Sequence, residues 1–171
     1  MNDPTVLSRC ERFVYDEAEL LDRQHFERWL ALFETDSAYW LPIDTTRREP
    51  HGGLNLVFDD RRRLEDRVSR FLSGFSHTED PVSRTSQLLG NVRVVNPEEA
   101  ATSFDWLPLG DADVVVSART IITRLRRQVT DVLPGRVEWL LRPFGDSFVI
   151  RMKRIDLLHA QDPLPALTFL L

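Results

Sequence analysis

The chain has 171 residues, 42% of them hydrophobic, and a formal net charge of −5. This length favours one domain spanning residues 1–171. The acidic balance excludes nucleic acid as the main partner, because phosphate binding needs a surplus of Lys and Arg. No apolar stretch reaches the length of a membrane span, so no membrane partner is expected.

Two features predict a cytoplasmic protein. The first residues lack the basic segment followed by an apolar one that a secretory signal requires. Cys10 is the single cysteine, so no disulfide can form within the chain. It falls on the apolar stripe of the first predicted helix, and we interpret it as a small buried hydrophobic residue.

Three helices are predicted in the first half of the sequence. Asp3 and Pro4 provide an N-cap and a first helical residue. Helical spacing then continues through Val6, Leu7, Cys10, Phe13, Val14, Glu17, Ala18 and Leu21. Asp22 is predicted to cap a second helix, whose apolar face is Phe26, Trp29, Leu30 and Phe33. A third helix is predicted to start at Asp59 or Asp60 and to end at Gly74, with an apolar face of Leu64, Val68, Phe71 and Leu72.

Short strands and a loop separate the second and third helices. Residues 37–44 are aromatic and contain Pro42 near their end, which predicts an edge strand or the exit of a strand. Residues 45–53 form a polar loop, and residues 54–58 predict a short strand.

After residue 85, β-branched and aromatic residues predict long antiparallel strands. In residues 113–126 two sets of side chains alternate, with Val114, Val116, Ala118 and Thr120 against Val115, Ser117, Arg119 and Ile121. The turn signals between strands read NPEE, LPLGD, LPG and FGD. Helices followed by such strands predict an α+β fold, in which N-terminal helices pack on a strongly curved sheet.

The spacing of the histidines disfavours a metal site. His25, His51, His77 and His159 are the four histidines, and no two are three to five residues apart. A mononuclear iron site needs two histidines and a carboxylate. A Rieske cluster needs two cysteines and two histidines, and this chain has one cysteine.

General acid–base chemistry stays open as an alternative. A curved sheet packed on helices can enclose a conical pocket. The candidates for its lining lie near helix–strand junctions and are Tyr39, Asp44, His51, Asp59 and His77. A buried Asp–His pair in such a pocket could transfer protons.

The segment before the first long strand is dense in polar residues. Arg84 follows Pro81 there, and its planar guanidinium could tie Glu79 and Asp80 to the sheet. We favour this structural anchor over the alternative, in which Arg84 binds a substrate carboxylate.

Three blocks occur together in a specific order and spacing. They are residues 13–43, FVYDEAELLDRQHFERWLALFETDSAYWLPI; residues 64–71, LEDRVSRF; and residues 79–94, EDPVSRTSQLLGNVRV. Together they resemble the β (small) subunit of the aromatic-ring-hydroxylating dioxygenases, the Rieske non-heme iron oxygenases. The late strands match that family only in pattern.

The resemblance implies a cone-shaped α+β fold shared with nuclear transport factor 2, ketosteroid isomerase and scytalone dehydratase. It implies a structural subunit with no catalytic residue, no metal and no cofactor of its own. A large α subunit, usually assembled as α3β3 with a trimer of β subunits, would carry a Rieske [2Fe–2S] cluster and a mononuclear non-heme iron. Electrons would come from NAD(P)H through a reductase. The residues expected to be structural or to lie at a subunit interface are Asp80, Pro81, Ser83, Arg84 and Asn91.

The sequence departs from the family pattern at two places. Residues 74–77, GFSH, stand where the family commonly has a Trp, and Ser86 and Gln87 stand where it commonly has a His. These departures keep two alternatives open. One is a stand-alone isomerase or dehydratase of the same fold with an Asp/His pair, and the other is a small ligand-binding module. Residues 101–113 have no predicted role.

Overall fold

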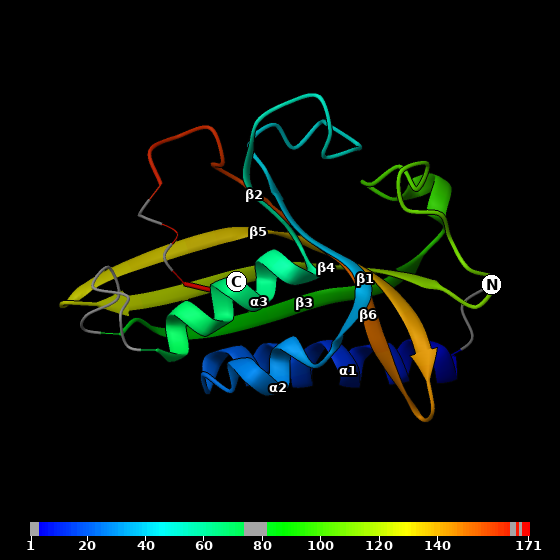
Figure 1. The fold of residues 1–171 in the computed structure, drawn as a ribbon, viewed down its shortest axis with the longest axis horizontal. Helices are drawn as coiled ribbons and strands as arrows, with labels where there is room; N and C mark the ends of the chain where they lie inside the picture. The colour runs from blue at the N-terminus through cyan, green and yellow to red at the C-terminus, as the bar shows by residue number, and fades with distance from the viewer. Residues whose placement is uncertain (1–3, 74–81, 165–166, 168) are drawn as a thin grey trace.

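The fold was analysed in a computed structural model that describes residues 4–73, 82–164, 167 and 169–171. Within these residues, helices come first and long strands follow (Figure 1). In chain order the elements are α1 (Pro4–Asp22), α2 (Phe26–Leu30), β1 (Phe33–Pro42), β2 (Asn55–Asp60), α3 (Arg61–Leu72), β3 (Arg84–Val95), the short 3-10 helix η2 (Pro97–Glu99), β4 (Val114–Arg126), β5 (Val129–Phe144) and β6 (Ser147–Leu157).

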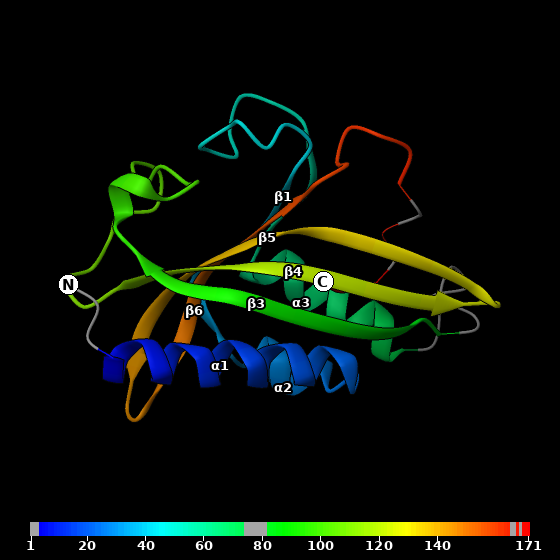
Figure 2. The same ribbon diagram turned by 180° about the vertical axis from the view of Figure 1, so that it is seen from behind.

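The strands form a mixed six-stranded sheet with the order β2-β1-β6-β5-β4-β3. Strands β1 and β6 are parallel, and the other neighbouring pairs are antiparallel. In Figures 1 and 2, β1 and β6 run steeply across the long strands β3 to β5, so the sheet is strongly curled. The helices lie on one side of it, and the loops after β1 and β3 lie on the other. This confirms the predicted α+β fold with N-terminal helices on a strongly curved sheet.

The main core fills the space between the helices and the inner face of the sheet. Apolar residues of α1 and α3 pack there against alternate residues of β4, β5 and β6. The largest side chains in this core are those of Trp29, Tyr39 and Trp139, which are at most 2% exposed. Burying such aromatic surface stabilises the fold by roughly 2–3 kcal/mol per side chain.

A second core lies on the outer face of the sheet. Leu107 and Ala100 cover Val115, Leu140 and Met152 there, together with the partly buried residues Phe58, Val95, Phe104 and Trp106. The segment 101–113, for which the sequence predicted no role, therefore covers one end of the outer face. The other end, on β3, β4 and β5 beyond this cover, stays open.

The predicted helices are largely confirmed, with two corrections. Helix α2 is only five residues long, and Phe33 starts β1 instead of continuing α2. Asp22 does not cap α2. Its carboxylate accepts hydrogen bonds from Thr85 Oγ1 (2.9 Å) and from the main-chain N–H of Gln87 (2.8 Å), and so it ties α1 to β3.

Helix α3 begins after Asp60, one of the two residues predicted to start it. Asp60 is its N-cap and accepts a hydrogen bond from the main-chain N–H of Arg63 (2.8 Å). Leu64 and Val68 are buried as predicted, but Leu72, the last residue of the helix, is 51% exposed. Asp3 and Gly74, the predicted outer limits of α1 and α3, lie outside the described residues.

Strand β1 lies between β2 and β6, so it is not an edge strand, but it ends at Pro42, as the alternative of a strand exit predicted. The turn predicted at LPG was wrong, since Pro134 and Gly135 pair with Ile121 and Thr120 inside β5. The turn between β4 and β5 is made by Arg127 and Gln128, both with positive φ.

Gly135 is predicted to be essential to the pairing of β5 with β6. A Cβ atom at this position would lie 2.4 Å from the main-chain oxygen of Asp156, which belongs to a rigid strand. We expect Gly135→Ala to lower the free energy of unfolding by about 1–3 kcal/mol. Urea unfolding followed by circular dichroism measures this.

Gly90→Ala is the matched control, because nothing lies within 4 Å of a Cβ atom built on Gly90 of β3. We expect this control to change stability by no more than about 0.5 kcal/mol. Equal losses in the two variants would show that close approach at Gly135 is not the cause.

Candidate functional site

A buried ion pair occupies the centre of the cone. Lys153 Nζ of β6 lies 2.7 Å from Glu17 Oε1 of α1, and both side chains are 1% exposed. Trp29 Nε1 of α2 donates a hydrogen bond to the same carboxylate oxygen. The Lys153 ammonium also lies 5.8 Å from the centre of the Trp29 ring. Three elements that are distant in sequence therefore meet at one charge pair.

The last residues of the chain complete this centre. Lys153 Nζ donates a second hydrogen bond to the main-chain oxygen of Leu171 (2.8 Å). The hydroxyl of Tyr39 donates to the same oxygen (3.1 Å) and accepts from the main-chain N–H of Leu171 (3.0 Å). Phe169 and Leu170 are also part of the core. The last residues of the chain therefore pack and bond with side chains of α1, α2, β1 and β6 at this centre.

Burial shifts the pKa values of two side chains at this centre, Lys153 and Tyr39. Desolvation lowers the pKa of Lys153, although the adjacent Glu17 carboxylate opposes that effect. Desolvation also raises the pKa of Tyr39 above its ordinary value, so the phenol stays protonated. Among the cavities whose lining the structure describes, none is lined by Glu17, Tyr39 or Lys153.

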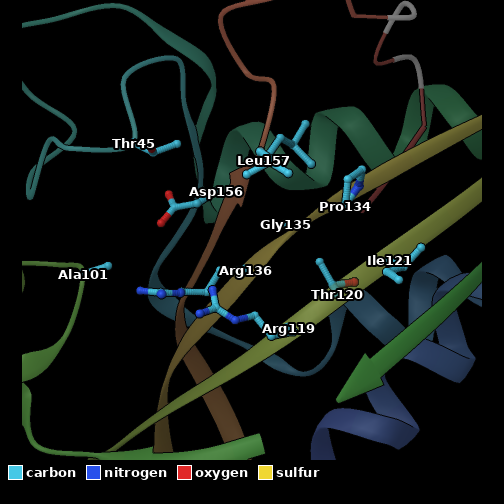
Figure 3. Close-up of a pocket in the computed structure, with 11 residues that line it drawn as sticks. Thr45, Ala101, Arg119, Thr120, Ile121, Pro134, Gly135, Arg136, Asp156 and Leu157 are labelled. Atoms are coloured by element: carbon cyan, nitrogen blue, oxygen red, sulfur yellow. The ribbon is translucent and has the colours of Figure 1, made fainter. Parts of the chain in front are cut away.

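A cavity of about 510 Å³ opens on the outer face instead (Figure 3). Its lining comes from β4, β5 and the end of β6, together with Thr45 and Ala101 from the two covering loops. Arg119, Arg136 and Asp156 are its charged residues. Burial raises the pKa of Asp156, while the neighbouring Arg154 and Arg136 guanidinium groups oppose that rise.

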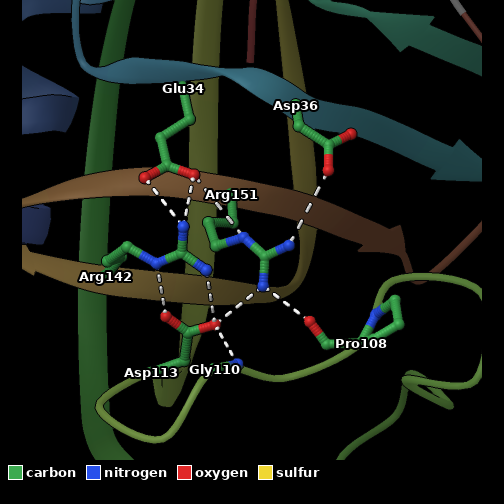
Figure 4. A network of polar contacts seen from close by, with 7 residues as sticks. All are labelled: Glu34, Asp36, Pro108, Gly110, Asp113, Arg142 and Arg151. Carbon is green, nitrogen blue, oxygen red and sulfur yellow. Dashed lines mark hydrogen bonds and ion pairs between the residues drawn. The ribbon is translucent and has the colours of Figure 1, made fainter.

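An ion-pair network fixes the end of the covering segment to the sheet (Figure 4). The Asp113 carboxylate lies 2.7 Å from Arg151 Nη1 and 3.0 Å from Arg142 Nε. It also accepts a hydrogen bond from the main-chain N–H of Gly110 (2.8 Å). Glu34 of β1 lies beside both arginines, 3.2 Å from Arg142 and 3.5 Å from Arg151. The network joins β1, β5 and β6 to the loop before β4.

Arg154 fastens the rest of that segment. It is 0% exposed and donates hydrogen bonds to the main-chain oxygens of Ala101 (2.7 Å) and Thr45 (2.9 Å) and to the Asp156 carboxylate (2.8 Å). Glu138, the residue paired with Arg154 across β5 and β6, accepts hydrogen bonds from the main-chain N–H groups of Ala101 and Thr102.

The acid–base candidates are spread over both faces of the sheet. Tyr39 pairs with Asp59 across β1 and β2, and Asp59 forms an ion pair with Arg67 Nε of α3 (2.6 Å). Asp44 lies in the turn after β1, where hydrogen bonds from Thr46 lower its pKa. His51 is exposed and packs its ring against Phe58 and Trp106 on the outer face. His77 lies outside the described residues, so this arrangement brings together Tyr39 and Asp59 only.

The described interface candidates all lie at or near β3. Ser83 is buried just before the strand, and its main-chain oxygen accepts a hydrogen bond from Gln24 Nε2 (3.1 Å). Arg84 is exposed at the first position of β3, and Asn91 forms a bulge with a φ of 53°. Asp80 and Pro81 lie outside the described residues. Whether Arg84 contacts Asp80 or Glu79 therefore stays a prediction.

Cys10 is fully buried on α1, as the sequence predicted, and burial raises its pKa to about 11. In the described part of the chain, no group of three or more His, Cys, Asp or Glu side chains is placed to hold a metal ion. The same residues include no helix long and apolar enough to cross a membrane.

Comparison with known proteins decides the family. A family profile described as "Ring hydroxylating beta subunit" matches residues 16–161. The chain belongs to this family of ring-hydroxylating β subunits.

Two curated relatives of this β subunit are small oxygenase components. The small oxygenase component of the p-cumate 2,3-dioxygenase system of Pseudomonas putida is 38% identical over 128 residues, which is 70% of each chain. The small subunit of anthranilate 1,2-dioxygenase from Acinetobacter baylyi is 33% identical over 153 residues, 86% of each chain.

Solved structures share the fold. The β subunit of benzoate 1,2-dioxygenase from Burkholderia mallei has a TM-score of 0.70 at 22% identity, covering 94% of this chain and 95% of that one. A chain of naphthalene 1,2-dioxygenase with indole bound has a TM-score of 0.78 at 18% identity, covering 100% and 88%. A putative scytalone dehydratase from Novosphingobium aromaticivorans has a TM-score of 0.58 at 14% identity, covering 88% and 82%. The fold is therefore shared with a putative dehydratase as well as with β subunits.

The sequence analysis missed the charge pair at the centre of the cone. Two signals pointed to it. Glu17 stands on the otherwise apolar stripe of α1, and Lys153, in β6, is the single lysine of the sequence. Because 136 positions separate the two residues, no local pattern could pair them.

Lys153→Met is expected to destabilise this β subunit strongly. The substitution leaves the Glu17 carboxylate in the core without its countercharge, which typically costs about 3–5 kcal/mol. The double variant Glu17→Gln, Lys153→Met removes both charges, and the new amide still accepts the hydrogen bond from Trp29. Urea unfolding should therefore show the double variant to be at least about 1 kcal/mol more stable than Lys153→Met alone. A double variant no more stable than the single one would rule out charge compensation as the role of Lys153.

Asp113→Asn is expected to loosen the segment 101–113 on the sheet. It should also change how the free energy of unfolding depends on pH in the acid range. Burial would raise the pKa of Asp113, but hydrogen bonds from Arg142, Gly110 and Arg151 outweigh it and hold the pKa below its ordinary value. A carboxylate with a lowered folded pKa stabilises the protein above its unfolded pKa, and this contribution is lost as pH falls through the folded pKa. We expect a loss of about 2–3 kcal/mol at pH 7 that shrinks below about pH 4.

The matched control is Asp36→Asn. Asp36 belongs to the same network, but its side chain is 90% exposed and its carboxylate lies 3.9 Å from Arg151 Nη2. We expect a change below about 0.5 kcal/mol in the control. Thermal and urea unfolding between pH 3 and pH 7 measure both variants. A pH-independent deficit in Asp113→Asn would contradict the role of its ionised carboxylate.

Proposed function

We propose that this chain, as one domain spanning residues 1–171, is the structural small subunit of a multicomponent aromatic-ring-hydroxylating dioxygenase in aromatic catabolism. Its partner is a large α subunit that carries the Rieske [2Fe–2S] cluster and the mononuclear non-heme iron. The two kinds of subunit assemble as α3β3 in the cytoplasm, with the β subunits in contact as a trimer. The small subunit itself contributes no catalytic residue and binds no metal.

The cluster of mutually bonded residues at the centre of the cone is the observation that carries this proposal. An isomerase or dehydratase of this fold needs space for substrate beside its acid and base. Here Glu17, Lys153, Trp29, Tyr39 and Leu171 occupy the centre and bond to one another. No described histidine belongs to the buried core, so the Asp–His pair of the alternative has no support from the described residues.

Surfaces outside the cone are then the places where function is expected. The open end of the outer face, formed by β3, β4 and β5, presents Leu88 (66% exposed) and Ile121 (44% exposed) in register with each other. Leu158, just after β6, is 82% exposed. Such a group of exposed apolar side chains is typical of a protein interface. Arg84 and Asn91 lie on the same strand as Leu88.

Co-expression with the neighbouring large-subunit gene tests the proposal. We expect a complex whose mass by size-exclusion chromatography with light scattering corresponds to three copies of each chain, and metal analysis that finds iron only when the large subunit is present. Stoichiometric iron or zinc in the small subunit alone, or turnover by it alone, would refute the proposal.

The variant Arg84→Ala tests the prediction that Arg84 anchors the segment before β3 or contacts a neighbouring subunit in that complex. Removing the guanidinium is expected to lower the free energy of unfolding by about 1 kcal/mol or to weaken assembly about tenfold, since charge-assisted hydrogen bonds are lost. Arg62→Ala is the control, because Arg62 is exposed on α3, away from β3. If the Arg84 variant melts and assembles like the parent and the control, neither the anchor nor the interface role holds.

A further inference from the structure

Two arginines face each other on the outer face without a partner. Arg119 of β4 and Arg136 of β5 occupy directly paired positions of the two strands. Arg119 is exposed and Arg136 is half-buried. Neither guanidinium forms a hydrogen bond or an ion pair with any residue that the structure describes, whereas Arg142, Arg151 and Arg154 each bind carboxylates.

This pairing is unfavourable by itself. Like charges directly opposite each other on antiparallel strands destabilise a sheet. On its other side, Arg136 of β5 pairs with Asp156 of β6. The Asp156 carboxylate, however, lies 2.8 Å from Arg154 Nε and is bound to that guanidinium. Asp156 therefore acts on Arg136 only as a nearby charge without a hydrogen bond, and no described carboxylate forms an ion pair with Arg119.

The two arginines share the wall of a cavity with apolar side chains. Figure 3 shows their side chains extending in the same direction from adjacent strands, toward the space between Ala101 and Asp156. Ile121, Pro134, Leu157 and Leu158 supply apolar surface in the same cavity of about 510 Å³. This volume is within the range of small-ligand sites.

We propose that this cavity is a carboxylate-binding site in which Arg119 and Arg136 hold the two oxygens and the apolar residues hold the group that carries them. A planar guanidinium fork matches the geometry of a carboxylate, and an apolar surrounding strengthens such charge-assisted bonds. The ligand is either a free aromatic carboxylate or an Asp or Glu side chain presented on the apolar surface of a neighbouring subunit.

The apolar walls favour a carboxylate on a hydrocarbon group over inorganic phosphate. Phosphate is surrounded by oxygen and would leave Ile121 and Leu158 facing a polar surface. Benzoate offers both a carboxylate and an apolar ring, and is therefore the probe of choice. Benzamide has the same shape without the charge.

The first arm of the test uses the small subunit alone. Benzoate, benzamide and phosphate are titrated at constant ionic strength, and the Nε–Hε signals of arginine are followed by NMR. We expect benzoate to shift the signals of Arg119 and Arg136 saturably, and benzamide and phosphate to bind at least about tenfold more weakly. The variant Arg119→Gln, Arg136→Gln is expected to weaken benzoate binding by at least about tenfold.

The control variant is Arg93→Gln. Arg93 is exposed on β3 and pairs with Ser117, two residues before Arg119 on β4, so it lies on the same face. It is not part of the cavity lining. Should the double variant fail to fold, Arg119→Gln alone removes one half of the pair at an exposed position. That single variant is expected to weaken benzoate binding severalfold.

The second arm rests on the proposed function and measures assembly with the large subunit. If the ligand is a partner's carboxylate, the double variant should raise the dissociation constant at least about tenfold over the parent and over Arg93→Gln. Benzoate binding that is lost in the double variant while assembly is unchanged identifies a free carboxylate as the ligand, and an assembly defect in the double variant, with or without benzoate binding, identifies a partner's side chain.

The proposal is overturned if benzoate binds no better than benzamide and the double variant assembles like Arg93→Gln. It is also overturned if benzoate fails to bind and even the parent does not assemble with the large subunit. In that last case the proposed function fails too. If the parent chain binds benzoate but does not assemble with the large subunit, the proposed function alone fails and the carboxylate site stands.

Discussion

The buried pair of Glu17 and Lys153 is the constraint around which the fold is arranged. An isolated charge in a protein interior is so unfavourable that each of these groups depends on the other. Glu17 comes from α1 and Lys153 from β6, while Trp29 of α2 and Tyr39 of β1 complete their surroundings. A shift of any of these elements by one residue would leave a buried charge or donor unbonded. We infer that the pair selects one register of the helices on the sheet, a role in specificity more than in net stability.

The outer face uses arginine for a different purpose. Arg154, Arg151 and Arg142 each make several hydrogen bonds or ion pairs, and together they hold the loops after β1 and β3 on one end of the sheet. One guanidinium has five donors in a fixed plane, so it can bind main-chain oxygens of two loops at once, as Arg154 does. Lysine would not replace it there. All but one of the 22 positively charged residues in the sequence are arginines, and for Arg154, Arg151 and Arg142 this choice has a structural use.

The sequence predicted what depends on neighbours along the chain and missed what depends on distant residues. The apolar spacing of α1, the cap of α3 at Asp60 and the alternation in β4 were all readable, because they arise within one or two turns or strand repeats. The LPG turn was wrong, because pairing with both β4 and β6 holds Pro134 and Gly135 in an extended strand. The true turn at Arg127 and Gln128 was missed, since neither residue is typical of positive φ. The ion pairs were missed for a related reason, as each joins residues that are far apart in sequence.

A comparison of the two faces explains how one fold can serve both enzymes and β subunits. In this chain the polar groups of the cone are directed at one another: Glu17 accepts from Lys153 and Trp29, and Tyr39 bonds to Leu171. A group that already has its partner inside the core cannot also bind a substrate without losing that bond. The outer face differs, because Arg119 and Arg136 have no partner among the described residues and stand beside exposed apolar side chains. These two arginines therefore offer positive charge on the surface, which is where a subunit meets its neighbours.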